Sequence, residues 1–294
     1  MKIKKIIKST FEGDGKDAVT FTMTCSKRLH LFKRTVPAFI EKCKDLHLIT
    51  KVIIFDDSSS EDDRYEMERL IEQSFPSINI DFVYFDNILT KYRHAYIMTH
   101  WFDALKTNFV FHLEDDFLMI DEFSLKDSID LINNDWNLYY VGFYQSLREF
   151  PDEYLVEFRE TEFGKNRDII YSKNNNYWLW PFIETKPIGQ SMFYDTVRCK
   201  EGSEEFNCNY WEYFVNYPPF GFQPGVTDVT KLKLIGNFDL TSKQDDSNVQ
   251  IEGNYGLRLY KKFYAIYSNK RKSTHLGSQF YNEKSAYDLN QSSR

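Results

Sequence analysis

The chain has 294 residues, enough for one large or two modest domains with a sizeable buried core. Its 37 Lys and Arg residues against 44 Asp and Glu residues give a net charge of −7, so the composition offers no general reason to bind nucleic acid or an anionic membrane. Aromatic residues make up 17% of the chain, which argues strongly against intrinsic disorder.

Targeting signals and paired cysteines are not evident. Residues 1–16 lack the apolar core of a signal peptide, and no run of eighteen apolar residues indicates a membrane span. The cysteines form no CxxC pair and have no histidine partners at zinc-finger spacing: Cys25, Cys43, Cys199 and Cys208. We interpret them as free thiols and expect a soluble cytoplasmic protein.

Strands and helices alternate along the first half of the chain. Apolar, β-rich runs predict strands at 18–24, 51–55, 78–85 and 108–113, and helical spacing of apolar residues predicts helices from Leu29, over 61–75 and over 91–106. Pro37 should kink or restart the first helix. Unalternating apolar strands separated by helices indicate a mostly parallel sheet covered on both faces, with ligands beyond the carboxyl ends of the strands.

After Tyr144 the pattern loosens. Residues 145–185 mix charged with aromatic side chains, as in a hairpin-containing insertion or lid. A short segment at 187–194, a helix at 203–215, a loop rich in proline and glycine at 217–225 and a basic, aromatic tail at 257–281 are expected to follow. We predict one continuous α/β domain with two halves, 1–144 and 145–294.

The strongest local signal is FVFHLEDDFL, residues 109–118, in which an apolar strand ends in Glu114, Asp115 and Asp116. Carboxylates packed at a strand end repel one another unless a cation offsets them, and their hard oxygens suit Mg²⁺ or Mn²⁺. The alternative is a solvated acidic run that caps the next helix.

Two further polar clusters follow predicted strands. In FDDSSS, residues 55–60, the aspartates can accept hydrogen bonds from a ribose hydroxyl or a base N–H, and the serines more simply cap the next helix. In TCSKR, residues 24–28, backbone N–H groups with Lys27 and Arg28 can face a diphosphate, or the basic residues can form a solvated turn.

Read together, four segments resemble in order and spacing the nucleotide-sugar-binding half of family 2-like glycosyltransferases of the GT-A fold: MTCSKR, FDDSSSEDD, KYRHAYIMTHWFDAL and FHLEDDFL. The resemblance covers residues 18–120 and extends weakly to residue 280. It implies a Rossmann-like GT-A domain in which 1–144 bind the nucleotide sugar and 145–294, with an aromatic-rich insertion and a C-terminal elaboration, form the acceptor side.

The resemblance also implies roles for individual residues. Asp116 would be the direct ligand of Mn²⁺ or Mg²⁺, Asp115 would bind the ribose or a metal-bound water, and Glu114 would lie at the periphery. The sequence reads EDD rather than a strict DxD, so the division between Asp115 and Asp116 stays open. The remaining nucleotide contacts implied are Asp57 on the base, with Asp56, Thr24, Ser26, Arg28 and Arg93 around the nucleotide.

Two more segments match the family's pattern. PIGQSMFY, residues 187–194, resembles an acceptor-side segment, and THLG, residues 274–277, resembles a C-terminal HxG whose His275 completes the metal site. His275 can also be an ordinary surface residue, and His94, His100 and His112 are interpreted as structural. Inverting transfer needs a carboxylate base, for which Glu205 and Glu212 are candidates, followed by Asp195 and Asp228.

These observations predict a metal-dependent glycosyltransferase that moves a sugar from a nucleotide diphosphate sugar, a UDP-sugar by preference, to a glycan or other hydroxyl acceptor. The alternatives are a non-catalytic nucleotide- or glycan-binding domain on the same fold and, less favoured, a two-metal phosphodiesterase. No nucleic-acid partner is expected.

Overall fold

The computed structural model describes residues 1–8, 15–86, 93–143 and 222–238, parts of 255–276, and five short strands elsewhere in the second half. Five helices are described: α1 (Leu29–Lys42), α2 (Glu61–Ser74), α3 (Arg93–Ala104), α4 (Leu125–Asn134) and α5 (Val229–Ile235). A short 3₁₀ turn, Leu46–Leu48, precedes the second long strand.

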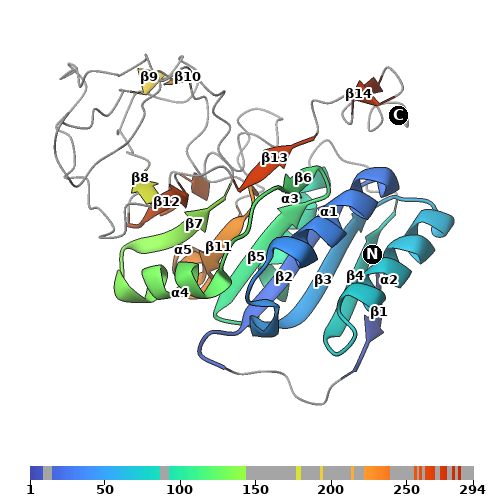
Figure 1. The fold of residues 1–294 in the computed structure, drawn as a ribbon, viewed down its shortest axis with the longest axis horizontal. Coiled ribbons are helices and arrows are strands. Elements are labelled where there is room, and N and C mark those ends of the chain that lie inside the picture. The colour runs from blue at the N-terminus through green and yellow to red at the C-terminus, as the bar shows by residue number, and fades with distance from the viewer. Residues whose placement is uncertain are drawn as a thin grey trace.

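Most described strands join one central sheet (Figure 1). Its nine strands lie in the order β1 (Lys2–Ile6), β4 (Asn79–Phe85), β3 (Ile49–Asp57), β2 (Val19–Cys25), β5 (Phe109–Glu114), β11 (Gly225–Asp228), β7 (Leu138–Gly142), β12 (Tyr264–Ser268) and β8 (Tyr177–Leu179). Three small pairs lie outside it: β6 (Phe117–Met119) with β13 (Ser273–His275), β9 (Phe193–Tyr194) with β10 (Tyr213–Phe214), and β14 (Phe280–Tyr281) with β15 (Lys284–Ser285).

The sheet is mixed but mostly parallel. The strands β2, β3, β4, β5, β7 and β12 run in one direction, whereas β1, β8 and β11 run in the other. This architecture confirms the predicted α/β class with a mostly parallel central sheet flanked by helices. The sheet takes strands from both predicted halves, and the boundary at residue 144 stays a prediction.

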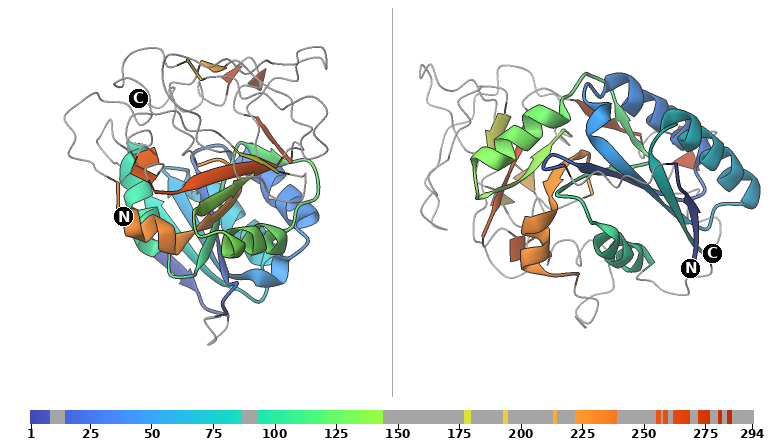
Figure 2. Two further views of the ribbon diagram at one scale, coloured as in Figure 1. Left: turned by 90° about the vertical axis from the view of Figure 1, so that its left-hand side faces the viewer. Right: turned by 90° about the horizontal axis from the view of Figure 1, so that it is seen from below.

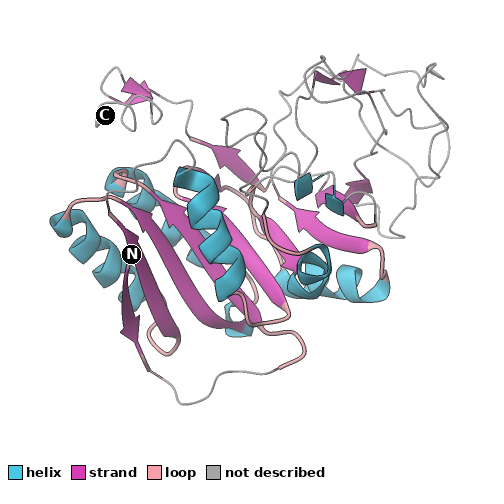
Figure 3. Ribbon diagram, turned by 180° about the vertical axis from the view of Figure 1, so that it is seen from behind, coloured by secondary structure: helices cyan, strands magenta, loops and turns pink. Residues whose placement is uncertain are grey.

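Helices cover both faces of the sheet. The helices α1, α2 and α4 lie on one face and α3 and α5 on the other, as Figures 2 and 3 show. Along β2 the side chains alternate accordingly: Phe21 and Met23 enter the core under α1 and α2, and Thr22 faces α3. Burial on two faces explains why these strands are apolar without alternation.

A buried polar group links the second face to helix α3. Thr22 Oγ1 accepts a hydrogen bond of 2.9 Å from Trp101 Nε1 and lies 2.9 Å from His112 Nδ1. The imidazole of His112 also packs edge-on against Trp101 and Phe222. The structure therefore places His112 inside the fold, as the structural interpretation requires.

Strand β11 enters the middle of the sheet from the distant second half. It runs antiparallel between β5 and β7, and its first residue, Gly225, pairs with His112 on one side and Gly142 on the other. A Cβ at Gly225 would overlap the ring of Tyr140 and the carbonyl of Val141. Glycine is needed here because the neighbouring strand approaches so closely.

Two local predictions differ from the structure. Helix α1 continues through Pro37, so the predicted restart does not occur. Pro37 has no N–H to donate to the Lys33 carbonyl, and both residues are exposed, so solvent can reach this part of the helix. The helix predicted at 203–215 is wrong at its end, because Tyr213 and Phe214 pair with β9 as a strand. Residues 203–212 lie outside the described residues.

Candidate functional site

The loops that follow β2, β3 and β4 are bound to one another at the carboxyl edge of the sheet. Ser26 Oγ donates to the Asp57 carbonyl at 3.0 Å, and the Ser58 N–H donates to the Phe85 carbonyl at 3.0 Å. Two non-glycine residues here, Lys27 and Ser58, have φ of 55° and 61°. Such backbone costs on the order of 1–3 kcal/mol per residue and persists only where its surroundings fix it.

At the end of β5, two consecutive carboxylates are buried beside one guanidinium. The side chains of Asp115 and Asp116 are 0% and 5% exposed, and that of Arg28 is 9% exposed. Arg28 Nε donates to Asp115 Oδ2 at 3.1 Å, Nη2 bonds Asp115 Oδ1, and Nη1 donates to Asp116 Oδ2 at 2.9 Å. Arg28 therefore supplies the positive charge that two adjacent buried carboxylates need.

The electrostatics separate the two aspartates. Complete burial and the adjacent Asp116 raise the pKa of Asp115 against the opposing effect of Arg28. Burial also opposes ionisation of Asp116, but the hydrogen bond from His275 and the charge of Arg28 hold its pKa below the usual range. Although burial opposes its charge, Arg28 has a raised pKa because both carboxylates surround it. Asp116 is thus the carboxylate held most firmly in its ionised form.

The C-terminal part of the chain brings a histidine to the same carboxylate. Strand β13 pairs antiparallel with β6, which directly follows the acidic cluster, and His275 lies opposite Phe117. His275 Nε2 lies 3.3 Å from Asp116 Oδ2, and the Leu276 N–H donates to the Asp116 carbonyl at 2.6 Å. The structure therefore brings together the two residues that the sequence assigns to the metal.

These residues fit one side of a divalent cation site. Asp116 Oδ1 is buried and has no hydrogen-bond partner among the described residues, whereas both oxygens of Asp115 are bound by Arg28. A buried, unpaired carboxylate oxygen is costly without a ligand. No group of three His, Cys, Asp or Glu side chains gathers for a metal in the described part of the chain, so Asp116 and His275 form a partial ligand set.

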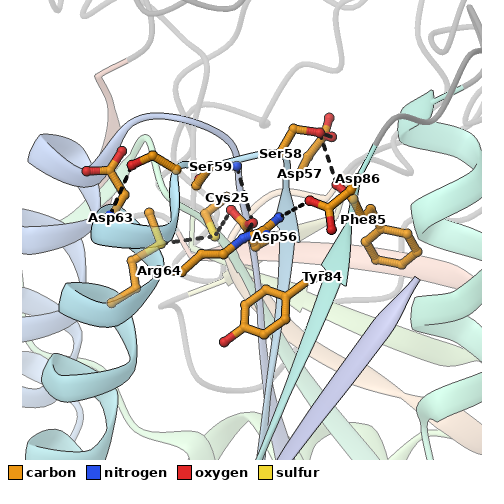
Figure 4. Close-up of polar contacts among 12 residues, drawn as sticks. Cys25, Asp56, Asp57, Ser58, Ser59, Asp63, Arg64, Tyr84, Phe85 and Asp86 are labelled. Atoms are coloured by element: carbon orange, nitrogen blue, oxygen red, sulfur yellow. Dashed lines mark hydrogen bonds and ion pairs between the residues drawn. The ribbon is translucent and has the colours of Figure 1, made fainter.

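At the end of β3, a second arginine holds a second aspartate (Figure 4). The side chain of Asp56 is 1% exposed; its Oδ2 accepts from Arg64 Nε at 2.7 Å and from the Ser59 N–H at 3.3 Å. The next residue, Asp57, is only half-buried, and its Oδ1 accepts from Ser58 Oγ at 3.2 Å. Asp56 is therefore committed inside the protein, and Asp57 is the more accessible carboxylate.

The other sequence-predicted residues have varied positions. Thr24 is buried at the end of β2, and its hydroxyl lies 3.5 Å from His112 Nε2. The Ser26 N–H donates to Asp115 Oδ2 at 3.3 Å. The structure gives the backbone of Arg93, the first residue of α3, but does not describe its side chain. Asp228 caps α5 and pairs with Lys231, whereas Glu205, Glu212 and Asp195 lie outside the described residues.

Sequence reasoning missed Arg64. This residue lies in the first half of α2, after three consecutive acids, Glu61, Asp62 and Asp63. The three acids offset the repulsion between the helix dipole and a positive side chain, so Arg64 has acidic neighbours in the sequence itself. No local signal therefore pointed to its pairing with Asp56. Ser60, by contrast, caps the helix as predicted and accepts from the Asp63 N–H at 3.1 Å.

Solved structures share this arrangement of strands and helices. A mannosyltransferase, PcManGT from Pyrobaculum calidifontis in complex with GDP-Man and Mn²⁺, superposes with a TM-score of 0.51 at 11% identity, over 90% of this chain and 58% of that one. This chain has a GT-A-like glycosyltransferase fold. At this identity the likeness establishes the fold and leaves the activity to be argued from the residues.

The S. aureus protein TarS, residues 1–349, superposes with a TM-score of 0.46 at 10% identity over 85% of this chain and 60% of that one. This chain thus spans about three fifths of the length of each of these two solved chains. No protein-family model and no curated protein sequence matches it. Within the described residues, every helix is too short or too polar to cross a bilayer.

Proposed function

We propose that this chain is a glycosyltransferase that transfers a sugar from a nucleotide diphosphate sugar, preferentially a UDP-sugar, to a hydroxyl acceptor with inversion. The observation that carries the proposal is the buried Asp115–Asp116 pair at the carboxyl end of β5, with His275 beside it. It occupies the edge of an α/β sheet at which ligands bind. The mannosyltransferase with this fold holds GDP-Man and Mn²⁺.

In this proposal the two aspartates divide the work. Asp115, bound through both oxygens, fixes Arg28 and the loop after β2. Asp116, through its unpartnered Oδ1, and His275 would hold Mn²⁺ or Mg²⁺. A bound divalent cation supplies Lewis-acid stabilisation of the departing diphosphate charge. We therefore propose Asp116, rather than Asp115, as the metal ligand of the EDD segment.

The nucleoside would lie across the neighbouring strand ends. Asp57 presents a half-buried carboxylate at the end of β3, suited to accept a hydrogen bond from a base N–H. Thr24 lies near the end of the adjacent strand β2, Ser26 directly follows that strand, and Arg93 begins α3. We assign these residues to nucleotide binding, with Asp56 supporting Asp57 from inside. Residues 1–144 would thus bind the donor and residues 145–294 the acceptor.

Inverting transfer also needs a base at the acceptor. Glu212 and Glu205 remain our candidates, since a general base must remove the proton of the attacking hydroxyl. Asp228 is a weaker candidate than the sequence indicated, because it caps α5 and pairs with Lys231 at 3.1 Å.

The two-metal phosphodiesterase alternative is not supported, because two of its four proposed carboxylate ligands bind arginines. It requires Asp56, Asp57, Asp115 and Asp116 to face one space, but Asp56 and Asp115 are each bound by an arginine. Asp56 and Asp115 are therefore not available as ligands of a second metal ion.

The proposal is tested by incubating the protein with a panel of UDP- and GDP-sugars, with Mn²⁺ or with a chelator, and measuring release of the nucleoside diphosphate. We expect metal-dependent release from one donor, faster when a suitable acceptor is added. Tight binding of a nucleoside diphosphate without turnover of any donor would instead favour the non-catalytic binding domain. Absence of both binding and turnover would contradict the proposed function.

A further inference from the structure

Arg64 connects the ends of two neighbouring strands. Its Nε donates to Asp56 at the end of β3, and its Nη2 donates at 2.6 Å to Asp86, which follows β4. Its guanidinium carbon lies 4.6 Å from the centre of the Tyr84 ring. Figure 4 shows the three partners around one planar group. Arginine suits this place because its rigid, planar fork serves two carboxylates and an aromatic face at once.

Arg64 differs from a solvated surface arginine in its burial. It follows the acidic first turn of α2. Its side chain is only 13% exposed, and within the described residues it is the cation that pairs with the buried Asp56 carboxylate. The pair therefore fixes the exact direction in which β3 ends.

That direction determines where Asp57 points. Asp57 follows Asp56 directly, its carbonyl is held by Ser26 Oγ at 3.0 Å, and the next residue, Ser58, is kept in left-handed backbone by the Phe85 carbonyl. The Phe85 carbonyl accepts from both the N–H and the Oγ of Ser58, each at 3.0 Å. Arg64 fixes the residue before Asp57, and these bonds fix the residue after it.

We propose that Arg64 is a positioning residue for nucleoside recognition: it holds Asp56 between the ends of β3 and β4 and so aims the Asp57 carboxylate at the base of the donor. The inference rests on the proposed function, because it needs a nucleotide at Asp57. Arg64 acts through Asp57 and does not itself touch the nucleotide.

The test is a double-mutant cycle with UDP as the probe and GDP alongside, measured by calorimetry for wild type, Arg64→Gln, Asp57→Ala and the double variant. Arg64→Gln should raise the dissociation constant about tenfold with unchanged stoichiometry, which corresponds to part of a hydrogen bond to a charged group. In the Asp57→Ala background the same substitution should add almost nothing, because the two residues act through one contact.

Multiplicative effects in the cycle would overturn the inference, because they would mean that Arg64 acts on binding independently of Asp57. A variant that is less stable but binds with the wild-type constant would also overturn it, since Arg64 would then be only structural. If wild type binds neither UDP nor GDP, the proposed function fails first, which distinguishes the two failures.

Two further variants guard against a simple folding defect. Arg64→Lys keeps the charge and can pair with Asp56 but cannot reach both acids, so its dissociation constant should lie between those of wild type and Arg64→Gln. Arg69→Gln is the matched control on the same helix, because Arg69 is half-exposed and pairs only with Glu66 within the described residues. A change in affinity in the Arg69 control as large as in Arg64→Gln would contradict the inference.

Discussion

Two consecutive aspartates stand at the carboxyl end of β3, as its last residues, and two more directly follow β5; at each end an arginine from another segment binds the first aspartate. At β3, Arg64 holds Asp56 and turns its other side to the exposed Asp86. At β5, Arg28 holds Asp115 and Asp116 together and is itself buried. The same sequence pattern therefore produces an arginine–carboxylate group with one exposed acid at β3 and a buried group at β5.

This difference in burial indicates which aspartate of each pair can bind a ligand. In both pairs an arginine binds the first aspartate. Of the second aspartates, Asp116 has a buried Oδ1 with no hydrogen-bond partner among the described residues, and Asp57 is half-buried. At β5 that oxygen is desolvated, which suits a cation; at β3 the carboxylate is half-buried, which suits a hydrogen bond to a base.

The largest effect is expected at the second aspartate of β5. Asp116→Asn should reduce transfer by at least about 10³-fold, because the carboxylate that would hold the cation loses its charge while keeping its shape. The measurement is donor turnover in Mn²⁺, with Mn²⁺ binding followed separately. Asp121→Asn is the control, since Asp121 is half-exposed and pairs with Lys272. Near wild-type turnover in Asp116→Asn would show the metal assignment to be wrong.

A second prediction distinguishes the acceptor side from the donor side, to which the ends of β3 and β5 belong. Glu212→Gln or Glu205→Gln, whichever removes the base, should lower transfer by about 10²–10⁴-fold while UDP and metal affinities stay unchanged. Kinetics and calorimetry on the same preparations measure this split. If neither variant loses transfer, the base lies elsewhere. If the stability falls instead, the carboxylate is structural.

A third prediction compares the two arginines in the free energy of unfolding. Arg28→Met should destabilise the protein by about 3–5 kcal/mol, because it leaves two buried carboxylates without their counter-charge. Arg64→Met should cost less, because Asp56 retains the Ser59 N–H and Asp86 is exposed. Urea unfolding at neutral pH compares them. Equal losses of unfolding free energy in the two variants would contradict the expected difference between the strand ends of β3 and β5.

The smallest effect concerns the second aspartate of β3. Asp57→Ala should weaken UDP binding by about 1.5–3 kcal/mol, the value of a hydrogen bond to a charged acceptor, and should leave metal binding intact. Calorimetry with UDP in the presence and absence of Mn²⁺ measures both. An unchanged UDP affinity would refute the role of Asp57.

The sequence predicted the features that depend on local pattern. Apolar runs placed β2 to β5, and the helical spacing of Phe32, Val36 and Phe39 placed α1. The acidic clusters could be assigned to one edge because parallel strands end there together. The α/β class followed from these elements.

Long-range contacts escaped the sequence because no local pattern encodes them. Arg28 was expected to face a diphosphate, but the left-handed backbone at Lys27 precedes a side chain that lies on Asp115 and Asp116. Arg28 binds two acids that lie several elements farther along the chain. Arg64 binds Asp56 across the turn between β3 and α2, and the sequence does not state the direction of that turn.

The place of β11 has a consequence for synthesis of the chain. β5 and β7 flank this strand, so after residue 142 is made each keeps an unpaired edge until residue 225 follows, 83 residues later by subtraction. At about 5–20 residues per second a ribosome needs about 4–17 s for that stretch. During this time β5 has one open edge and β7 has two, because β12, the other neighbour of β7, is made after β11. Open strand edges can pair with other chains, so a nascent protein of this kind would benefit from a chaperone.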